Sequence, residues 1–255
     1  ILDSGSYTLN FNEPLLNGGG GGGLTVQGSG TVVLASGSTY TGATAVNGGT
    51  LALAGGSAIP DAGAVVLANA AGARLQLNNS ETIGSLAGGG PLGGNVNLQG
   101  NTLTTGGNNS TTRFDGVTAG GATSALVKTG TGRFTLGGAN GHAGSTTVVA
   151  GTLALADSGR LADASTLVVS GGQFDMGTLA DTVARVQLTG GSIVNGTLTS
   201  TSSFDLQTGS VGAVLAGSVG LAKTTSGTVT LSAANQATGT TVVDGGTLAL
   251  AGGNN

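Results

Sequence analysis

The amino-acid sequence predicts an all-β protein whose chain winds as a parallel β-helix (β-solenoid) of about 11–12 coils. Three observations support this fold class. One long phrase ending in Gly-Thr-Leu-Ala-Leu-Ala occurs three times, at Leu24–Ala54, Leu126–Ala156 and Leu221–Ala251. Short apolar runs inside each phrase alternate with period two, as half-buried strands do. The chain holds 53 glycines yet is 38% apolar, a combination that suits many tight turns around a packed core.

The second copy of the phrase shows where strands are expected. Its three runs are Arg133–Leu136, Thr146–Val148 and Thr152–Leu155, and segments rich in Gly and Ala separate them. Successive side chains of a strand point to opposite faces. If Leu153 points into the core, its neighbour Ala154 therefore points outward.

The length of one coil follows from the interval between related runs. Gly30–Leu34 is followed by its variant Gly49–Leu53, and Gly227–Val229 is followed at the same interval by Gly246–Leu248. This interval of roughly 20 residues fits one coil stacked on the next, with Leu and Val ladders inside. At about 4.8 Å per coil, the expected rod is about 50–60 Å long.

A longer period connects the three copies. Their first residues are Leu24, Leu126 and Leu221, and this spacing predicts a super-repeat of about five coils with joints near residues 24, 126 and 221. Residues 1–255 are expected to form a single continuous β-helix, with the glycine-rich run 18–23 as a loop. The segment is also expected to be a fragment of a longer chain.

The copies share a detailed residue pattern. The second copy carries it through Lys128, Gly130, Gly132, Leu136, Asn140, Gly144, Thr146 and Val148. The third copy carries it through Lys223, Gly227, Leu231, Asn235 and Gly239. The first copy departs most, with Val26 at the Lys position, but keeps Tyr40–Gly42. This pattern resembles the autotransporter-associated β-strand repeat of type V secreted proteins of Gram-negative bacteria.

The resemblance implies a passenger region, which is a right-handed parallel β-helix exported through a C-terminal β-barrel translocator outside this segment. It implies an extracellular location at the bacterial cell surface and a non-enzymatic role as elongated scaffold or stalk. Passengers of this kind commonly take part in adhesion, self-association or a biofilm matrix. The partners expected on this basis are further copies of the protein, or a glycan or protein surface of the host or matrix.

No residue is predicted to be catalytic, to bind a cofactor or to ligate a metal ion. Cysteine is absent and His142 is the single histidine. Its position among Gly and Ala in the turn Asn140–Gly144 indicates a residue that faces solvent. Ala156–Arg160 resembles the nucleophile loop of serine proteases but lacks its leading Gly. A triad would also need a histidine within hydrogen-bond reach of Ser158, and His142 is the only candidate.

Two alternatives to a scaffold are a β-helix polysaccharide lyase or glycosidase, and a passive spacer for an effector domain outside this segment. A glycan-cleaving enzyme needs clustered carboxylates, whereas the acidic residues here are dispersed. The most suggestive recurrences are Phe114–Asp115, Phe174–Asp175 and Phe204–Asp205. Alternation places each Phe inside and each Asp outside, and recurrence at equivalent positions favours a scaffold role.

Composition argues against two further classes. The seven basic residues are scattered and only 3% of residues are aromatic, so neither phosphates nor bases of a nucleic acid would find a binding surface. The longest weakly polar stretch, Gly63–Ala73, is too short to span a bilayer. We therefore expect no nucleic-acid partner and no membrane insertion by this segment. The abundant threonines are expected to fill outward strand positions.

Overall fold

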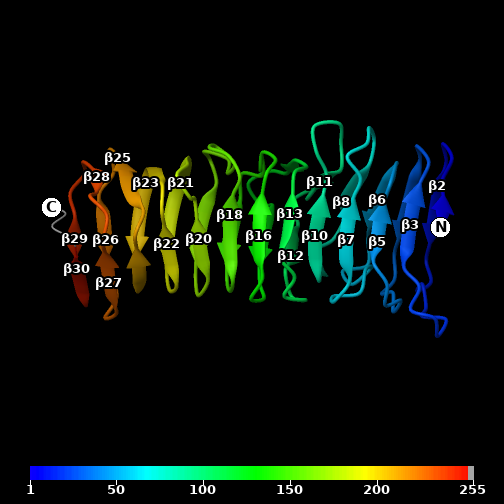
Figure 1. Ribbon diagram of the computed structural model, residues 1–255, viewed down its shortest axis with the longest axis horizontal. Helices are drawn as coiled ribbons and strands as arrows, with labels where there is room; N and C mark the ends of the chain where they lie inside the picture. Colours follow the sequence, from blue (N-terminus) through cyan, green and yellow to red (C-terminus); the bar gives the residue numbers. More distant parts are fainter. Residues whose placement is uncertain (252–255) are drawn as a thin grey trace.

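The computed structural model describes residues 1–251, which form an elongated stack of coils with 30 β-strands and no helix (Figure 1). Every ladder between these strands is parallel, and the strands form sheets of 13, 6 and 11 strands along the rod. The predicted parallel β-solenoid is confirmed, with about 12 coils. In the described range no helix is long and apolar enough to cross a membrane.

The three sheets are the faces of the solenoid. Sheet A contains β1 (Leu2–Asp3), β3 (Leu24–Gln27), β5 (Thr44–Val46), β7 (Ala64–Leu67), β10 (Ser85–Gly88), β13 (Thr112–Phe114), β16 (Arg133–Leu136), β18 (Thr152–Leu155), β20 (Gln173–Asp175), β22 (Ser192–Val194), β24 (Gly209–Val211), β27 (Thr228–Leu231) and β30 (Thr247–Leu250). Sheet B contains β2 (Thr8–Phe11), β4 (Thr31–Leu34), β6 (Thr50–Leu53), β8 (Arg74–Leu77), β11 (Asn95–Asn97) and β14 (Thr118–Ala119). Sheet C contains β9 (Glu81–Ile83), β12 (Thr102–Thr105), β15 (Ala125–Lys128), β17 (Ser145–Val148), β19 (Thr166–Val169), β21 (Ala180–Leu188), β23 (Thr197–Leu206), β25 (Val214–Gly217), β26 (Leu221–Lys223), β28 (Gln236–Ala237) and β29 (Val242–Val243).

The pairing of residues between neighbouring strands of sheet A gives the number of residues in each coil. The shortest coil places Ile193 beside Val211, and the longest places Gly88 beside Phe114. The other coils measured in this sheet are intermediate in length, close to the expected value of about 20 residues. The longest coil includes the loop that joins β10 to β11, which projects beyond the coils next to it (Figure 1).

The core is one continuous column of inward side chains. Val32, Leu51 and Leu75 stack in register across sheet B and are fully buried. The predicted strands of the second copy are confirmed as β16, β17 and β18. Burial of such a ladder removes apolar surface from water in every coil, and it is the main favourable contribution to folding.

Ala154 faces outward on β18 as predicted but is nevertheless buried. Arg133 on β16 and Asp175 on β20 form an ion pair of 2.9 Å, and β18 lies between these two strands. Asp175 is also the direct ladder neighbour of Ala154. The ion pair therefore crosses β18 and covers the methyl group.

The three copies of the repeated phrase do not occupy equivalent faces. Leu126 and Leu221 both lie in sheet C, five coils apart, joined by the ladder Leu126, Thr146, Leu167, Val186, Phe204 and Leu221. Leu24 lies in sheet A instead. The super-repeat expected from the sequence therefore places the second and third copies equivalently but not the first.

The Phe–Asp recurrences show the same displacement, because Phe114 lies in sheet A and Phe204 in sheet C. Their expected equivalence was wrong. Each copy of the phrase supplies two strands, a wide corner and two more strands, and the corner of the third copy also contains the short strand β28 (Gln236–Ala237). Any two consecutive faces of the solenoid accept that sequence of elements, so the pattern does not determine which face a copy begins on.

Candidate functional site

His142 lies inside the solenoid, so its predicted position in solvent was wrong. Its side chain is 1% exposed, with Nδ1 3.1 Å from Thr118 Oγ1 and Nε2 3.0 Å from Thr146 Oγ1. In the first copy Tyr40 holds the same place, and its hydroxyl lies 2.6 Å from Thr44 Oγ1. In the first and second copies the wide corner has no regular strand to fill its interior, and an inward ring occupies that volume.

The hydrogen bonds around His142 determine its tautomer. Asn140 donates through Nδ2 to two backbone carbonyls, so its Oδ1 accepts the Thr118 hydroxyl at 2.8 Å. Thr118 Oγ1 can then only accept from His142, which places the imidazole proton on Nδ1. Nε2 accepts the Thr146 hydroxyl. Burial lowers the pKa of His142 and keeps the ring neutral.

The protease-like loop does not assemble a triad. Ser158 Oγ accepts a hydrogen bond from the Ala180 amide at 3.2 Å. Asp157 Oδ2 lies 2.6 Å from Arg160 Nη2. Both ring nitrogens of His142 are engaged by threonine hydroxyls, so this histidine has no free nitrogen with which to activate Ser158.

Two buried lysines were not foreseen from the sequence. Lys128 and Lys223 are at most 1% exposed. Lys128 Nζ donates to the carbonyls of Thr129, Gly130 and Ala150 at 2.5, 2.9 and 3.2 Å, and burial lowers its pKa. A signal was available, because Val26 stands at this position in the first copy and the residue two before each lysine is an inward Leu.

Two buried carboxylates connect successive coils. Glu81 Oε1 and Oε2 accept the amides of Ile59 and Ala58 at 2.9 and 3.1 Å, and burial raises the pKa of Glu81 to about 7. Asp181 accepts the amides of Arg160 and Leu161 through a single oxygen, Oδ2, at 2.8 and 3.2 Å. Each carboxylate belongs to a strand of sheet C and holds the corner of the preceding coil, so its role is structural.

The Phe–Asp pairs lie as alternation predicts. Phe114, Phe174 and Phe204 are fully buried. The Asp that follows each of them forms an ion pair on the outer surface: Arg113–Asp115 at 2.7 Å, Arg133–Asp175 at 2.9 Å and Arg185–Asp205 at 3.4 Å. These carboxylates lie on separate coils and two sheets, each beside its own arginine, rather than around a common point.

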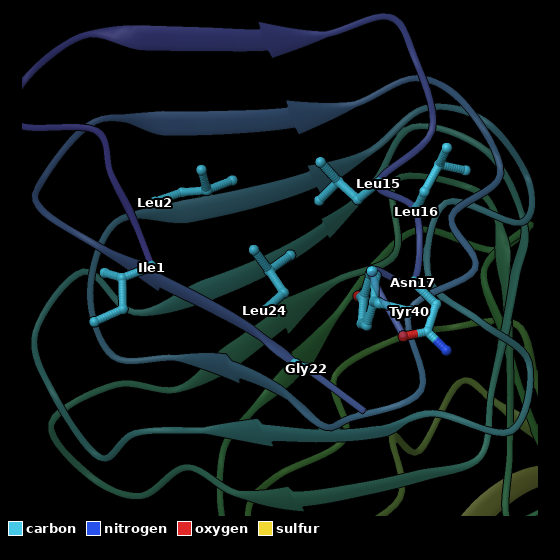
Figure 2. Close-up of a pocket in the computed structure, with 10 residues that line it drawn as sticks. Ile1, Leu2, Leu15, Leu16, Asn17, Gly22, Leu24 and Tyr40 are labelled. Atoms are coloured by element: carbon cyan, nitrogen blue, oxygen red, sulfur yellow. The ribbon is translucent and has the colours of Figure 1, made fainter. Parts of the chain in front are cut away.

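Two hollows lie at the ends of the coil stack. The one near the N-terminus, about 250 Å³, is lined mainly by apolar side chains, among them Leu15, Leu24 and Tyr40 (Figure 2). The one near the C-terminus, about 320 Å³, is lined by Leu221, Leu231 and other apolar residues together with Asn235 and Thr241. Both are continuous with the hydrophobic core and carry no cluster of polar groups.

A third and larger hollow, of about 560 Å³, lies on the side of the rod, and we call it the lateral groove. It runs along the corner that follows sheet A in successive coils. Segments 89–91, 115–117 and 137–139 contribute to its lining, together with Asn69, Asn95 and Arg160. The loop between β10 and β11, which projects from the rod in Figure 1, contributes Gly89, Gly90 and Pro91 to this lining. No group of three or more His, Cys, Asp or Glu that could hold a metal ion occurs in residues 1–251.

Comparison with known proteins gives a consistent result. A family model described as passenger-associated-transport-repeat matches residues 24–53, 126–155 and 221–250. The chain is 38% identical over 178 residues to the Adhesin BmaC autotransporter of Brucella suis biovar 1 (strain 1330). That alignment covers 65% of this chain but only 5% of the relative. No solved structure matches the chain. The resemblance of the repeated phrase to autotransporter passenger repeats is confirmed.

Proposed function

We propose that this segment is a non-enzymatic part of an autotransporter passenger, placed outside the bacterial cell, where it acts as an elongated scaffold of an adhesive surface protein. The observation that carries the proposal is the set of three passenger repeats, each built into the coils of one solenoid. The similarity to an adhesin autotransporter supports the same role.

The physical basis of a scaffold role is the regular stacking. Each coil satisfies its backbone hydrogen bonds through its two neighbours, and the Leu, Val and Phe ladders give a continuous core. About 12 coils at about 4.8 Å give a rod of roughly 55 Å. The chain contains no cysteine, which suits a polypeptide exported before it folds.

Adhesive contact would use the outward residues of the strands. Thr8, Thr31 and Thr50 form one such outward row on sheet B, and Gln173, Ser192 and Ser210 form another on sheet A. The net charge of the chain is only −4, so two copies repel each other weakly. Self-association and contact with glycans or proteins of a host or matrix are the interactions we propose.

A glycan-cleaving enzyme is less well supported. Glycoside hydrolysis needs two carboxyl groups on either side of the scissile bond. Among the described residues Asp115 is the single carboxylate that lines the lateral groove, and Arg113 holds it at 2.7 Å.

The proposal is tested by coating beads with the purified segment and measuring their adhesion to host cells, to matrix proteins and to each other. Beads carrying an unrelated β-solenoid of similar length are the control. We expect attachment or clumping above that control. Beads that neither attach nor clump would reduce the segment to a passive spacer, and hydrolysis of a polysaccharide would contradict a non-enzymatic role.

A further inference from the structure

The lateral groove contains two asparagines that the backbone holds in fixed orientations. Asn69 Oδ1 accepts the Leu92 amide at 2.8 Å, and Asn95 Oδ1 accepts the Val117 amide at 2.9 Å. Within residues 1–251 neither Nδ2 group has an acceptor. Both asparagines line the groove, so each presents an oriented pair of N–H donors to whatever enters it.

Two charged side chains complete the polar lining, and each is held by a partner of opposite charge. Asp115 receives Arg113 Nε at 2.8 and 3.0 Å, and its side chain remains 38% exposed. Arg160 is fixed through Nη2 by Asp157 at 2.6 Å and remains 22% exposed. The groove thus offers a carboxylate acceptor and a guanidinium donor in set positions, while its net charge stays near zero.

Glycine allows the coils to stack closely along the groove. A Cβ on Gly138 would collide with the carbonyl group of Gly116 in the preceding coil, and one on Gly137 would collide with Asp115 Oδ1. Position 138 therefore tolerates no side chain while the coils stack as they do, and a side chain at position 137 would displace the carboxylate. The hollow of about 560 Å³ is a consequence of the stacking at this corner, and its volume lies within the usual range of ligand sites.

We propose that the lateral groove binds a neutral oligosaccharide chain. Vicinal hydroxyl groups both donate and accept, which matches oriented amide and guanidinium donors beside a carboxylate. An acidic polymer would need unpaired basic residues, and the arginine that lines the groove is paired with Asp157. A peptide would need an open strand edge or apolar side-chain pockets, and the groove is lined by corners rather than strand edges. This inference rests on the proposed adhesive role and names the ligand class for it.

The test is a ¹⁵N NMR titration of the purified segment with maltohexaose, cellohexaose and mannohexaose, compared with a hyaluronan hexasaccharide and a Gly-Ser decapeptide. We expect at least one neutral hexasaccharide to shift the Asn69 and Asn95 side-chain amides and the Gly137 and Gly138 backbone amides. Concentrations up to about 10 mM cover the weak affinity expected without aromatic stacking. No shift from any neutral probe, or shifts from the acidic sugar or peptide alone, would overturn the proposal.

Variants with matched controls locate the binding. Ala139 is exposed and lines the groove, so Ala139→Phe should fill it and abolish the shifts. Ala122 is exposed in the corner between β14 and β15, and Ala122→Phe should leave binding unchanged. Asp115→Asn should weaken binding about tenfold through loss of a charged acceptor, whereas Asp205→Asn, on sheet C, should not. Unchanged binding in Ala139→Phe would contradict this location.

The outcomes separate this inference from the proposed function. A segment that binds a hexasaccharide in the groove while coated beads fail to adhere would contradict the adhesive role and keep the binding site. Adhesion that is unchanged in Ala139→Phe, together with an absence of hexasaccharide shifts, would keep the adhesive role and overturn the site.

Discussion

His142 Nε2 lies 3.0 Å from the hydroxyl of Thr146, four residues later, inside the widest corner of the second repeat copy. Tyr40 and Thr44 make the corresponding contact in the first copy. In these two copies, two different rings therefore fill the corner and bond a threonine on the following strand. The identity of the ring is less constrained than its size and its polar edge.

This relationship predicts that His142→Tyr is tolerated and His142→Ala is not. The tyrosine should fill the corner as Tyr40 does, with a stability change below about 1 kcal/mol, whereas alanine should cost about 2–4 kcal/mol through the cavity it leaves. The midpoint of urea unfolding, followed by circular dichroism, measures both changes. Equal midpoints for the two variants would contradict a packing role for the ring.

Protonation of His142 predicts a loss of stability in acid. Its pKa in the folded protein lies below the usual 6.5, so the unfolded chain takes up the proton first. The stabilisation from the neutral ring is complete above pH 6.5 and decreases as the pH falls below it. The urea midpoint of the wild type relative to that of His142→Tyr should fall between about pH 7 and pH 5, because the two proteins share every other titrating group and differ only in the imidazole.

For Glu81 we predict the opposite dependence on pH, with stability decreasing as the pH rises. Its pKa is raised from 4.5 to about 7 on folding, so its contribution is complete below pH 4.5 and is lost as the pH rises through 7. The shift corresponds to about 3 kcal/mol across that window. Glu81→Gln should lose one acceptor for the Ala58 and Ile59 amides, at about 1 kcal/mol.

The difference in urea midpoint between wild type and Glu81→Gln isolates the pH-dependent contribution of Glu81 from those of all other titrating groups. That difference should be largest near pH 4.5 and should shrink or reverse by about pH 8. Glu13→Gln is a suitable control, because Glu13 is exposed. A difference that stays constant over the whole range would show that Glu81 ionises normally in the folded protein.

We predict that replacing a buried lysine lowers the free energy of unfolding. Lys128→Met keeps the length of the side chain but leaves the Thr129, Gly130 and Ala150 carbonyls without their donor. We expect a loss of about 1–3 kcal/mol. Val26→Met, at the equivalent position of the first copy, adds volume without removing a hydrogen bond and serves as the comparison. Urea midpoints for Lys128→Met at or above that of the wild type would contradict this role.

The strands and the inward Leu residues were predictable because alternation and the interval between related runs report directly on one coil. The inward position of His142 was not, since alternation describes strands and His142 lies in a corner. The burial of Lys128 was not predicted either, because a charged side chain is buried only where polar partners compensate it, and its backbone carbonyl partners are known only from the structure.

The face on which each copy begins was hidden for a different reason. The phrase repeats its own local geometry, so nothing within Leu24–Ala54 distinguishes a start in sheet A from a start in sheet C. That choice depends on the lengths of the intervening coils, including the long coil between Gly88 and Phe114. The lateral groove was hidden as well, because its lining residues come from five coils between Asn69 and Arg160.

The equivalent positions of Leu126 and Leu221 predict that residues 126–220 can be removed as a unit. Deletion joins Ala125 to Leu221, which then enters sheet C in the place of Leu126, with every later strand of the third copy on its expected face. We expect a folded rod shorter by five coils, or by about 24 Å. Deletion of residues 126–210 instead puts Val211, a residue of sheet A, into the sheet C position and should expose core side chains. Circular dichroism and small-angle X-ray scattering distinguish the two products. Collapse of the first variant, or regular folding of the second, would contradict the register that connects the second and third copies.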